Sequence, residues 1–441
     1  MSAAQDSHSD RNAMQEKLYA LIANEEDARV CTDIPDAACR EVPGNFMRIL
    51  ASLVLTKLGD LVTSPKTVLA WVMGTLGASP VLSGLLVPVR ESGSLLPQLV
   101  IGAWVRGHAR RKQFWVLGSV LQGVAMLAMA AAVAWMDTSV APLAIILLLV
   151  AFSLSRGLCS VAMKDVQGKC VPKSRRGRLT GLASTFSGLL AVAVSGLMML
   201  DNVQGSRLFL AALLGLAGII WVLAAVVFSR VTEYPGESNG GGNALREALA
   251  SLSLLRTDRP FRRFVLARAL LLCSALSAPF VILVAQRLDT GLGSLALFLL
   301  ASSLASSLSA SFWGWMADTS ARDVMTRGGL MSSALVLLVA AAVLMDALDG
   351  ESAWLLPLAY FILGIGHAGV RVGRKTYLVD MAGGNKRTDY VAVSNSVIGA
   401  LLLLVGVISG LVASLGEAWA LLLLGLMGLA GAFVTRALPQ V

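Results

Sequence analysis

The sequence predicts an all-α integral membrane protein with twelve transmembrane helices arranged in two six-helix halves. Hydrophobic residues make up 56% of the 441 positions and charged residues only 14%, whereas soluble domains carry about 25% charged residues. Apolar runs that reach the roughly 20 residues needed to cross a bilayer recur from about residue 46 to the end of the chain. These runs are continuously apolar rather than alternating, which argues against a membrane β-barrel.

Twelve stretches are long and apolar enough to be spans. We place them at residues 46–73, 80–104, 113–135, 140–163, 179–200, 207–229, 261–286, 290–316, 326–346, 352–376, 388–412 and 416–437. This arrangement puts five loops that are rich in Lys and Arg on one side of the membrane: 106–112, 164–178, 230–263, 318–327 and 371–387. Basic loops concentrate on the cytoplasmic side of membrane proteins. We therefore expect an inner (cytoplasmic) membrane protein with both termini in the cytoplasm.

Polar segments divide the chain into four expected parts. Residues 1–45 form an acidic cytoplasmic segment, with nine Asp or Glu against four Lys or Arg. The first six-helix half is expected at 46–229, a cytoplasmic linker at 230–260 and the second half at 261–437. The linker contains SNGGGN, which is typical of a flexible connection. Because the formal charge of +9 arises in the short loops between spans, we do not expect nucleic acid as a partner.

Two short basic loops half a chain apart resemble each other. GAWVRGHARRK begins at Gly102 after the second span, and GWMADTSARD begins at Gly314 after the eighth. Longer basic loops, KDVQGKCVPKSRRGR and RVGRKTYLVDMAGGNKR, follow the fourth and tenth spans. An internal repeat with six spans in each half is typical of transporters built from parallel repeats.

On these motifs the chain resembles the major facilitator superfamily (MFS) of secondary transporters, over roughly residues 46–437. The loop signature of that family is GxxxDRxGRR, and its aspartate is thought to anchor a charge network that locks the cytoplasmic gate. The matching residues are Gly314, Asp318 and Arg322 in the second copy and Gly102, Arg110 and Arg111 in the first. Arg106 stands where the first copy would carry its acid. The resemblance implies that Asp318 serves this gate and that the first half closes it differently.

The resemblance also implies the class of activity, which is transport by alternating access between the two halves. The chain has no Walker A motif, so we do not expect ATP to drive it. No nucleophile–base or metal constellation is evident, so we expect neither an enzyme, a cofactor nor a metal site. The five cysteines lack CxxC spacing, and we assign them no disulfide. The span-five GP motif of drug/proton antiporters and the PESPR of sugar porters are absent, which leaves the subclass unidentified.

The first two spans carry charged residues near the middle of the bilayer. Lys57 and Asp60 lie ~16–21 Å along the first span, and Arg90 and Glu91 reach a similar depth in the second. Ionisable groups at this depth are costly and by default indicate function. One pairing would join Asp60 to Arg90, and another would join Lys57 to Glu91. The group either binds substrate or only braces the two helices.

Cations outnumber carboxylates at this depth. The cationic residues are Lys57, Lys66, Arg90 and Arg268, and the carboxylates are Asp60 and Glu91. Guanidinium and ammonium groups attract carboxylate or phosphate. We therefore expect a small organic anion, or a zwitterion with an acidic group, as substrate. Asp60 and Glu91 are the candidates for proton coupling, because protonation would release a cation for the substrate.

Three further residues have two open interpretations. His367 shares a helical face with Tyr360 and Arg371 and is either a proton relay or a hydrogen-bonding packing residue. Arg156 and Arg371, like Arg268, lie nearer the cytoplasmic ends of their predicted spans, where they either extend to the membrane surface or belong to the site.

The expected function is therefore the transport of a small solute across the lipid bilayer by a monomer, with protons as the coupling ion. One alternative is an exporter or flippase for an amphipathic, acid-bearing molecule, such as a siderophore, a lysolipid or a drug-like compound. Another is a receptor or assembly factor that uses the same fold without transport.

Overall fold

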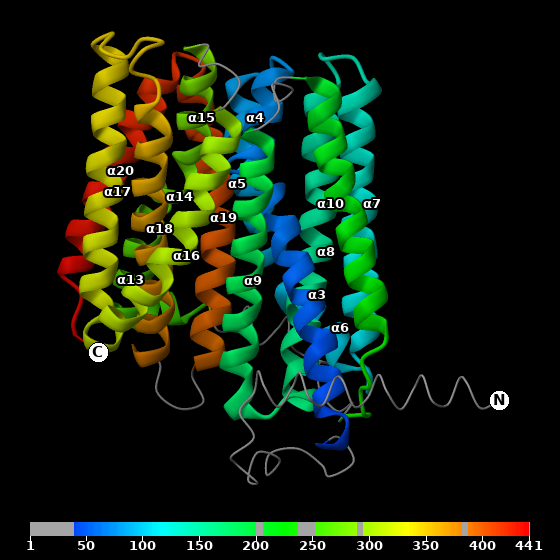
Figure 1. The fold of residues 1–441 in the computed structure, drawn as a ribbon. Coiled ribbons are helices and arrows are strands. Elements are labelled where there is room, and N and C mark those ends of the chain that lie inside the picture. Colours follow the sequence, from blue (N-terminus) through cyan, green and yellow to red (C-terminus); the bar gives the residue numbers. More distant parts are fainter. Residues whose placement is uncertain (1–38, 200–205, 237–251, 289–293, 382–386, 441) are drawn as a thin grey trace.

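The structure is a computed structural model that describes residues 39–199, 206–236, 252–288, 294–381 and 387–440. Within these ranges all regular structure is helical, and the long helices run side by side (Figure 1). The acidic segment predicted at residues 1–45 and the SNGGGN sequence lie largely outside the described residues. Cys39 is disulfide-bonded, so the expectation of no disulfide is wrong for this residue.

Ten helical stretches in the described part of the chain are long and apolar enough to cross a membrane. Nine are single helices: α7 (Lys112–Trp135), α8 (Ala141–Cys170), α9 (Lys173–Met199), α10 (Arg207–Ser229), α16 (Ser294–Thr319), α17 (Ala321–Leu344), α18 (Leu355–Met381), α19 (Arg387–Ala413) and α20 (Glu417–Arg436). The tenth stretch is divided into α13 (Arg259–Leu270), α14 (Cys273–Leu276) and α15 (Ala278–Arg287). The prediction of a multi-pass helical membrane protein is confirmed, and twelve spans are consistent with this structure.

The first two predicted spans are each split into two helices. The first consists of α3 (Val42–Val62) and α4 (Val68–Thr75), and the second consists of α5 (Pro80–Leu95) and α6 (Gln98–Arg106). Pro65 and Pro97 lie at the two breaks. Proline has no N–H to donate and disfavours helical geometry in the residue before it, so a break there is expected. Each of these four helices is shorter or more charged than a regular span. The first two predicted spans are therefore not among the ten helical stretches counted above.

The helices pack in two sets that meet along two seams. In the first set α7 packs against α8 and α10, and α3 packs against α9 and α10. In the second set α17 packs against α18 and α20, and α16 packs against α18. The seams join α5 to α19 and α9 to α16. At the first seam a Cβ on Gly410 would lie 2.9 Å from Cα of Val81, so only glycine permits this approach.

Among the described residues, the two sets share an apolar core at one end of the molecule and not at the other. The shared core includes Leu69 and Met73 of α4 and Phe280 and Ile282 of α15. At the other end, where α3 begins and α20 ends (Figure 1), each set has a core of its own. The sets are therefore joined at the α4–α15 end and part toward the Val42 end.

Candidate functional site

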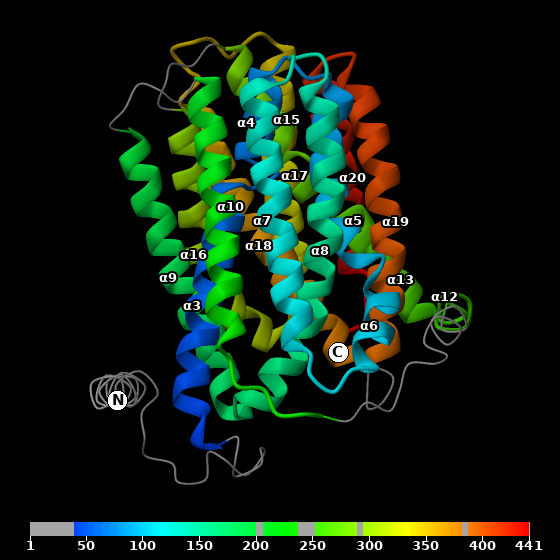
Figure 2. The ribbon, with the colours of Figure 1, turned by 90° about the vertical axis from the view of Figure 1, so that its right-hand side faces the viewer.

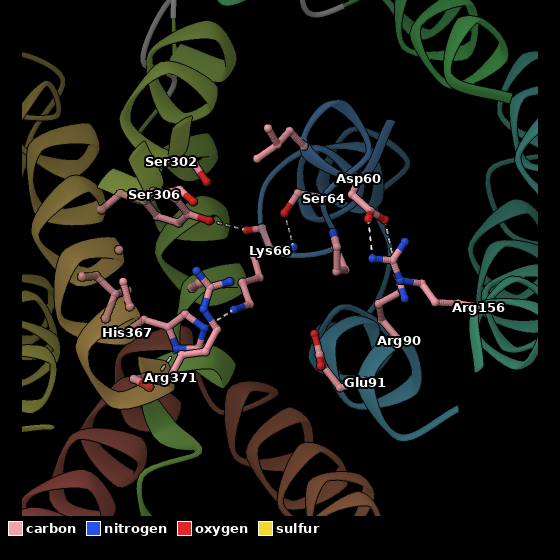
Figure 3. A pocket seen from close by; sticks show the side chains of 18 residues that line it. Asp60, Ser64, Lys66, Arg90, Glu91, Arg156, Ser302, Ser306, His367 and Arg371 are labelled. Carbon is pink, nitrogen blue, oxygen red and sulfur yellow. Dashed lines mark hydrogen bonds and ion pairs between the residues drawn. The ribbon is translucent and has the colours of Figure 1, made fainter. Parts of the chain in front are cut away.

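A cavity of about 260 Å³ lies between the two sets, near the break between α3 and α4. Six charged side chains and one histidine line it (Figure 3): Asp60, Lys66, Arg90, Glu91, Arg156, His367 and Arg371. Five of these are site residues predicted from the sequence. The other two are Arg156 and Arg371, whose position in the sequence left their role open. The cavity thus combines four cations with two carboxylates.

Asp60 accepts from two arginines. Its Oδ1 lies 2.7 Å from Nη2 of Arg90, and its Oδ2 lies 2.5 Å from Nη2 of Arg156. The Arg90 guanidinium also lies over the ring of Phe152, 4.7 Å from its centroid. Of the two pairings considered, the one between Asp60 and Arg90 is present. Asp60 therefore links α3 to both α5 and α8.

Lys57 does not pair with Glu91. Its ammonium donates to the backbone oxygen of Thr180, at 3.4 Å, and to the hydroxyl of Ser184, both on α9. Lys57 lines a second cavity of about 170 Å³ inside the first set of helices. Asp60 and Arg156 line this cavity as well, so their ion pair stands between the two cavities.

Lys66 lies in the turn between α3 and α4 and reaches across to α18. Its Nζ is 2.8 Å from Nε2 of His367, and Nδ1 of His367 is 3.1 Å from the Ser274 hydroxyl. An ammonium can only donate, so Nε2 accepts and the ring is neutral, with its hydrogen assigned to Nδ1 from these contacts. Tyr360 donates to the backbone oxygen of Lys66 at 3.1 Å. The helix break thus supplies both a donor and an acceptor to the opposite set.

Two charged side chains of the cavity have no direct partner among the residues that the structure describes. Neither Glu91 nor Arg371 makes an ion pair or a side-chain hydrogen bond with any described residue. Their interactions with other charged groups act over longer distances. Glu91 lies within electrostatic range of Lys66, Arg90 and Arg374. Figure 3 shows Glu91 and Arg371 on opposite sides of the cavity, on α5 and α18. A ligand that enters the cavity therefore meets an unpaired guanidinium.

Arg268 is buried away from the central cavity. It lies on α13 and donates to the hydroxyl of Ser394 at 2.6 Å and to Oδ1 of Asn395 at 2.9 Å, both on α19. Only 7% of its surface is exposed. Its contacts join two helices of the second set, and it does not line the space where the other predicted residues meet.

The first copy of the loop motif is held by acids that the motif itself lacks. Arg111 pairs with Asp165 of α8 at 2.9 Å, and its backbone N–H donates to the carboxylate of Glu233, which follows α10. Arg110 is exposed, and Gly102 lies in α6 with open space beside its Cα. Sequence reasoning did not find Glu233, because its partners, at the start of α7 and on α8, are distant in the chain.

The second copy of the motif makes fewer contacts with the rest of the described structure. Asp318 is exposed and makes no ion pair with any described residue. Arg322 contacts Asp323 at 3.3 Å and donates to the backbone oxygen of Leu438 at 3.2 Å. Gly314 has open space beside its Cα. The gate role of this motif stays a prediction.

Comparisons with known proteins agree with this architecture. Of the solved structures, the nucleoside transporter NupG aligns with a TM-score of 0.68 and 12% identity, over 89% of this chain and 99% of that chain. A D-xylose-proton symporter aligns with a TM-score of 0.67 and 14% identity, over 89% and 97%. A POT family transporter in complex with 5-aminolevulinic acid aligns with a TM-score of 0.67 and 12% identity, over 88% and 95%. Identities this low show a shared fold.

Sequence comparison gives the family directly. No curated protein matches the sequence. The sequence model of the Major Facilitator Superfamily, however, matches residues 58–300, which is more than half of the chain. The chain is therefore a member of the Major Facilitator Superfamily, as the loop motifs and the paired six-span pattern predict.

Proposed function

We propose that this protein is a secondary active transporter that moves a small organic anion, or a zwitterion with an acidic group, by alternating access. The observation that carries the proposal is the central cavity, whose lining has four cationic side chains and two carboxylates. With His367 neutral, the lining has a formal excess of two positive charges. A cavity of this sign attracts anions and repels cations.

The unpaired guanidinium of Arg371 is the proposed contact for the acidic group of the substrate. Guanidinium presents donors in a fixed fork that matches carboxylate or phosphate. The cavity volume of about 260 Å³ lies below the ~300–1,000 Å³ of sites for drug-sized ligands. Both features favour a small acid over a large amphipathic compound.

The one-sided closure supports alternating access. The apolar core that α4 and α15 share closes one end, while the two sets have separate cores at the other. If the two sets separated at the α4–α15 end and came together at the Val42 end, the charged residues of the cavity would become accessible from the opposite side of the membrane. We place the protein in the cytoplasmic membrane with both termini inside, because the basic loops lie on the side of the Val42 end. We further propose that it acts as a monomer.

Proton coupling is proposed at the two carboxylates of the cavity. Protonation of Asp60 would discharge the partner that holds Arg90 and Arg156, and so free both guanidiniums. Protonation of Glu91 would remove the negative charge that faces Lys66 and Arg374. Either step would increase the attraction of the cavity for an anion. Two structures of the same fold support these proposals. One is a D-xylose-proton symporter, whose name states coupling to protons. The other is a POT family transporter in complex with 5-aminolevulinic acid, which has an acidic and an amino group.

The test is a ligand screen by thermal shift on the purified full chain, with carboxylates, phosphates, amino acids and organic cations. We expect acids or zwitterions to raise the melting temperature. Arg371→Gln should weaken binding of the best ligand by about tenfold, because a hydrogen bond to a charged group is lost. Arg230→Gln, at an exposed position outside the cavity, is the matched control. Stabilisation by organic cations alone would contradict the proposal.

A further inference from the structure

Three exposed arginines form a stripe on the outer face of α13. Arg259, Arg262 and Arg263 are spaced so that they project within about 100° of one another on a helix. Leu266 continues the stripe one turn deeper and is 52% exposed. The opposite face of the same helix is buried, with Phe261, Phe264, Val265 and Arg268 inside. The stripe therefore points away from the transport cavity.

The structure shows no side-chain partner for these arginines among the residues that it describes. Among the described residues, none of the three has an ion pair or a side-chain hydrogen bond, and neither does exposed Arg256 in the preceding helix α12 (Leu254–Thr257). Asp258, the adjacent acid, is used as the N-cap of α13, where it accepts from the N–H of Phe261 at 3.0 Å and from the hydroxyl of Tyr390. Four neighbouring guanidiniums thus have no counter-ion within the part of the chain that the structure describes.

The stripe lies at the depth of lipid headgroups. The span Arg259–Arg287 has 29 residues, which is ~43 Å of helix against a hydrocarbon core of ~30 Å. About four residues at each end therefore stand in the headgroup region, which places Arg259–Arg263 among headgroups and Leu266 among acyl chains. Figure 2 shows α12 and α13 at the edge of the molecule, beside α19. A lipid can reach this face from the surrounding bilayer.

We propose that the outer face of α13, with Arg256, Arg259, Arg262 and Arg263 above Leu266, binds the headgroup of an anionic phospholipid. The phosphodiester would accept from the guanidinium forks, and the acyl chains would cover Leu266. The charge preference of cytoplasmic loops explains basic residues anywhere in this segment. It does not explain why three of them share one lipid-facing arc with an exposed leucine below.

The experiment measures lipid binding to the purified full chain by native mass spectrometry, in detergent with added phosphatidylglycerol or phosphatidylcholine of equal chain length. The wild type should bind phosphatidylglycerol about tenfold more tightly than phosphatidylcholine. R259Q/R262Q/R263Q should lose this preference, and R263Q alone should weaken it. The charge-matched control R178Q/R230Q/R327Q removes three exposed arginines elsewhere and should keep it.

Each remaining outcome would overturn the proposal. Equal binding of the two lipids by the wild type, a comparison that needs no variant, would show no headgroup recognition. Equal losses in the two triple variants would show that only the overall charge matters. Competition by soluble glycerol 3-phosphate at the concentration of the lipid would identify a site for free phosphate instead.

Discussion

Asp60 shares one carboxylate between two guanidiniums, and this makes it the side chain whose substitution separates coupling from transport. In Asp60→Asn, Arg90 and Arg156 keep a neutral acceptor but lose the negative charge that protons could titrate. We expect uptake driven by a pH gradient to fall to the level seen without a gradient, while exchange of substrate across the membrane continues. The measurement is paired uptake and counterflow in proteoliposomes, with Glu91→Gln in parallel. Unchanged gradient-driven uptake in Asp60→Asn would assign coupling elsewhere.

The residues of the cavity could be predicted only in part, and the reason lies in the ends of the helices. Asp60, Arg90 and Glu91 were found from their depth in the first two spans. Arg156 and Arg371 were left open because their predicted spans end at residues 163 and 376. The actual helices continue to Cys170 and Met381, which places both arginines well inside. Polar residues extend these helices beyond the apolar run, so hydropathy alone misplaces their ends.

At the scale of elements, Glu233 fastens the ends of several helices of the first set. Its buried carboxylate accepts from the N–H groups of Arg111 and Lys112 at the start of α7, and from Nζ of Lys169 on α8 at 2.9 Å. Removing it would leave buried donors unpaired, so Glu233→Ala should destabilise the protein by about 3 kcal/mol. Glu233→Gln should lose less. Thermal unfolding in detergent measures both, with exposed Glu351→Gln as the control that should leave the melting temperature unchanged.

The α5–α19 seam depends on the absence of side chains. A Cβ on Gly410 would lie 2.9 Å from backbone of α5, and backbone cannot move aside without separating the helices. Gly410→Leu should therefore cost about 1–3 kcal/mol of stability. Gly181→Ala is the matched control, because Gly181 is also helical but has open space beside it, and alanine there favours the helix. A neutral Gly410→Leu in thermal unfolding would show that the seam is loosely packed.

Prolines illustrate how far sequence rules reach at this scale. Proline disfavours a continuous helix, and Pro65 and Pro97 each lie at a complete break in their spans. Pro88 lies inside α5, which continues past it. The difference is not visible in the sequence, because it depends on what packs beside the ring. The ring of Pro88 packs against Gly406 of α19, where a Cβ would lie 2.1 Å from Cγ of the proline. Because Gly406 has no side chain, the ring fits there and α5 continues.

At the scale of the whole molecule, Gln286 is a polar contact that helps to close one end. It lies on α15 and its Nε2 donates to the backbone oxygen of Trp71 on α4 at 3.0 Å. Gln286→Ala should weaken this closure and raise the population open at the α4–α15 end. The measurement is labelling of a single Ser306→Cys in the cavity, in a background without native cysteines, by reagent applied from each side. Exposed Gln113→Ala is the control, and equal labelling in both variants would remove Gln286 from the closure.

The fold class and family followed from the sequence, but the asymmetry between the two ends did not. Apolar runs, basic loops and the Gly314 motif suffice for a helical bundle of this superfamily. Whether Leu69 packs against its own set or against Phe280 of the other set leaves no mark on hydropathy. The same segments could serve a state that opens on either side, so the sequence alone does not select one.

Lys66 and His367 hold a contact that joins the two sets in the centre of the molecule, at 2.8 Å. In the proposed cycle this contact and the one from Tyr360 must break and re-form each time access changes sides. In that cycle they would contribute to the kinetic barrier of the empty carrier. A substrate that replaces them with its own contacts would lower that barrier. The empty carrier would then change sides more slowly than the loaded one, and this difference would limit leakage of the driving ion.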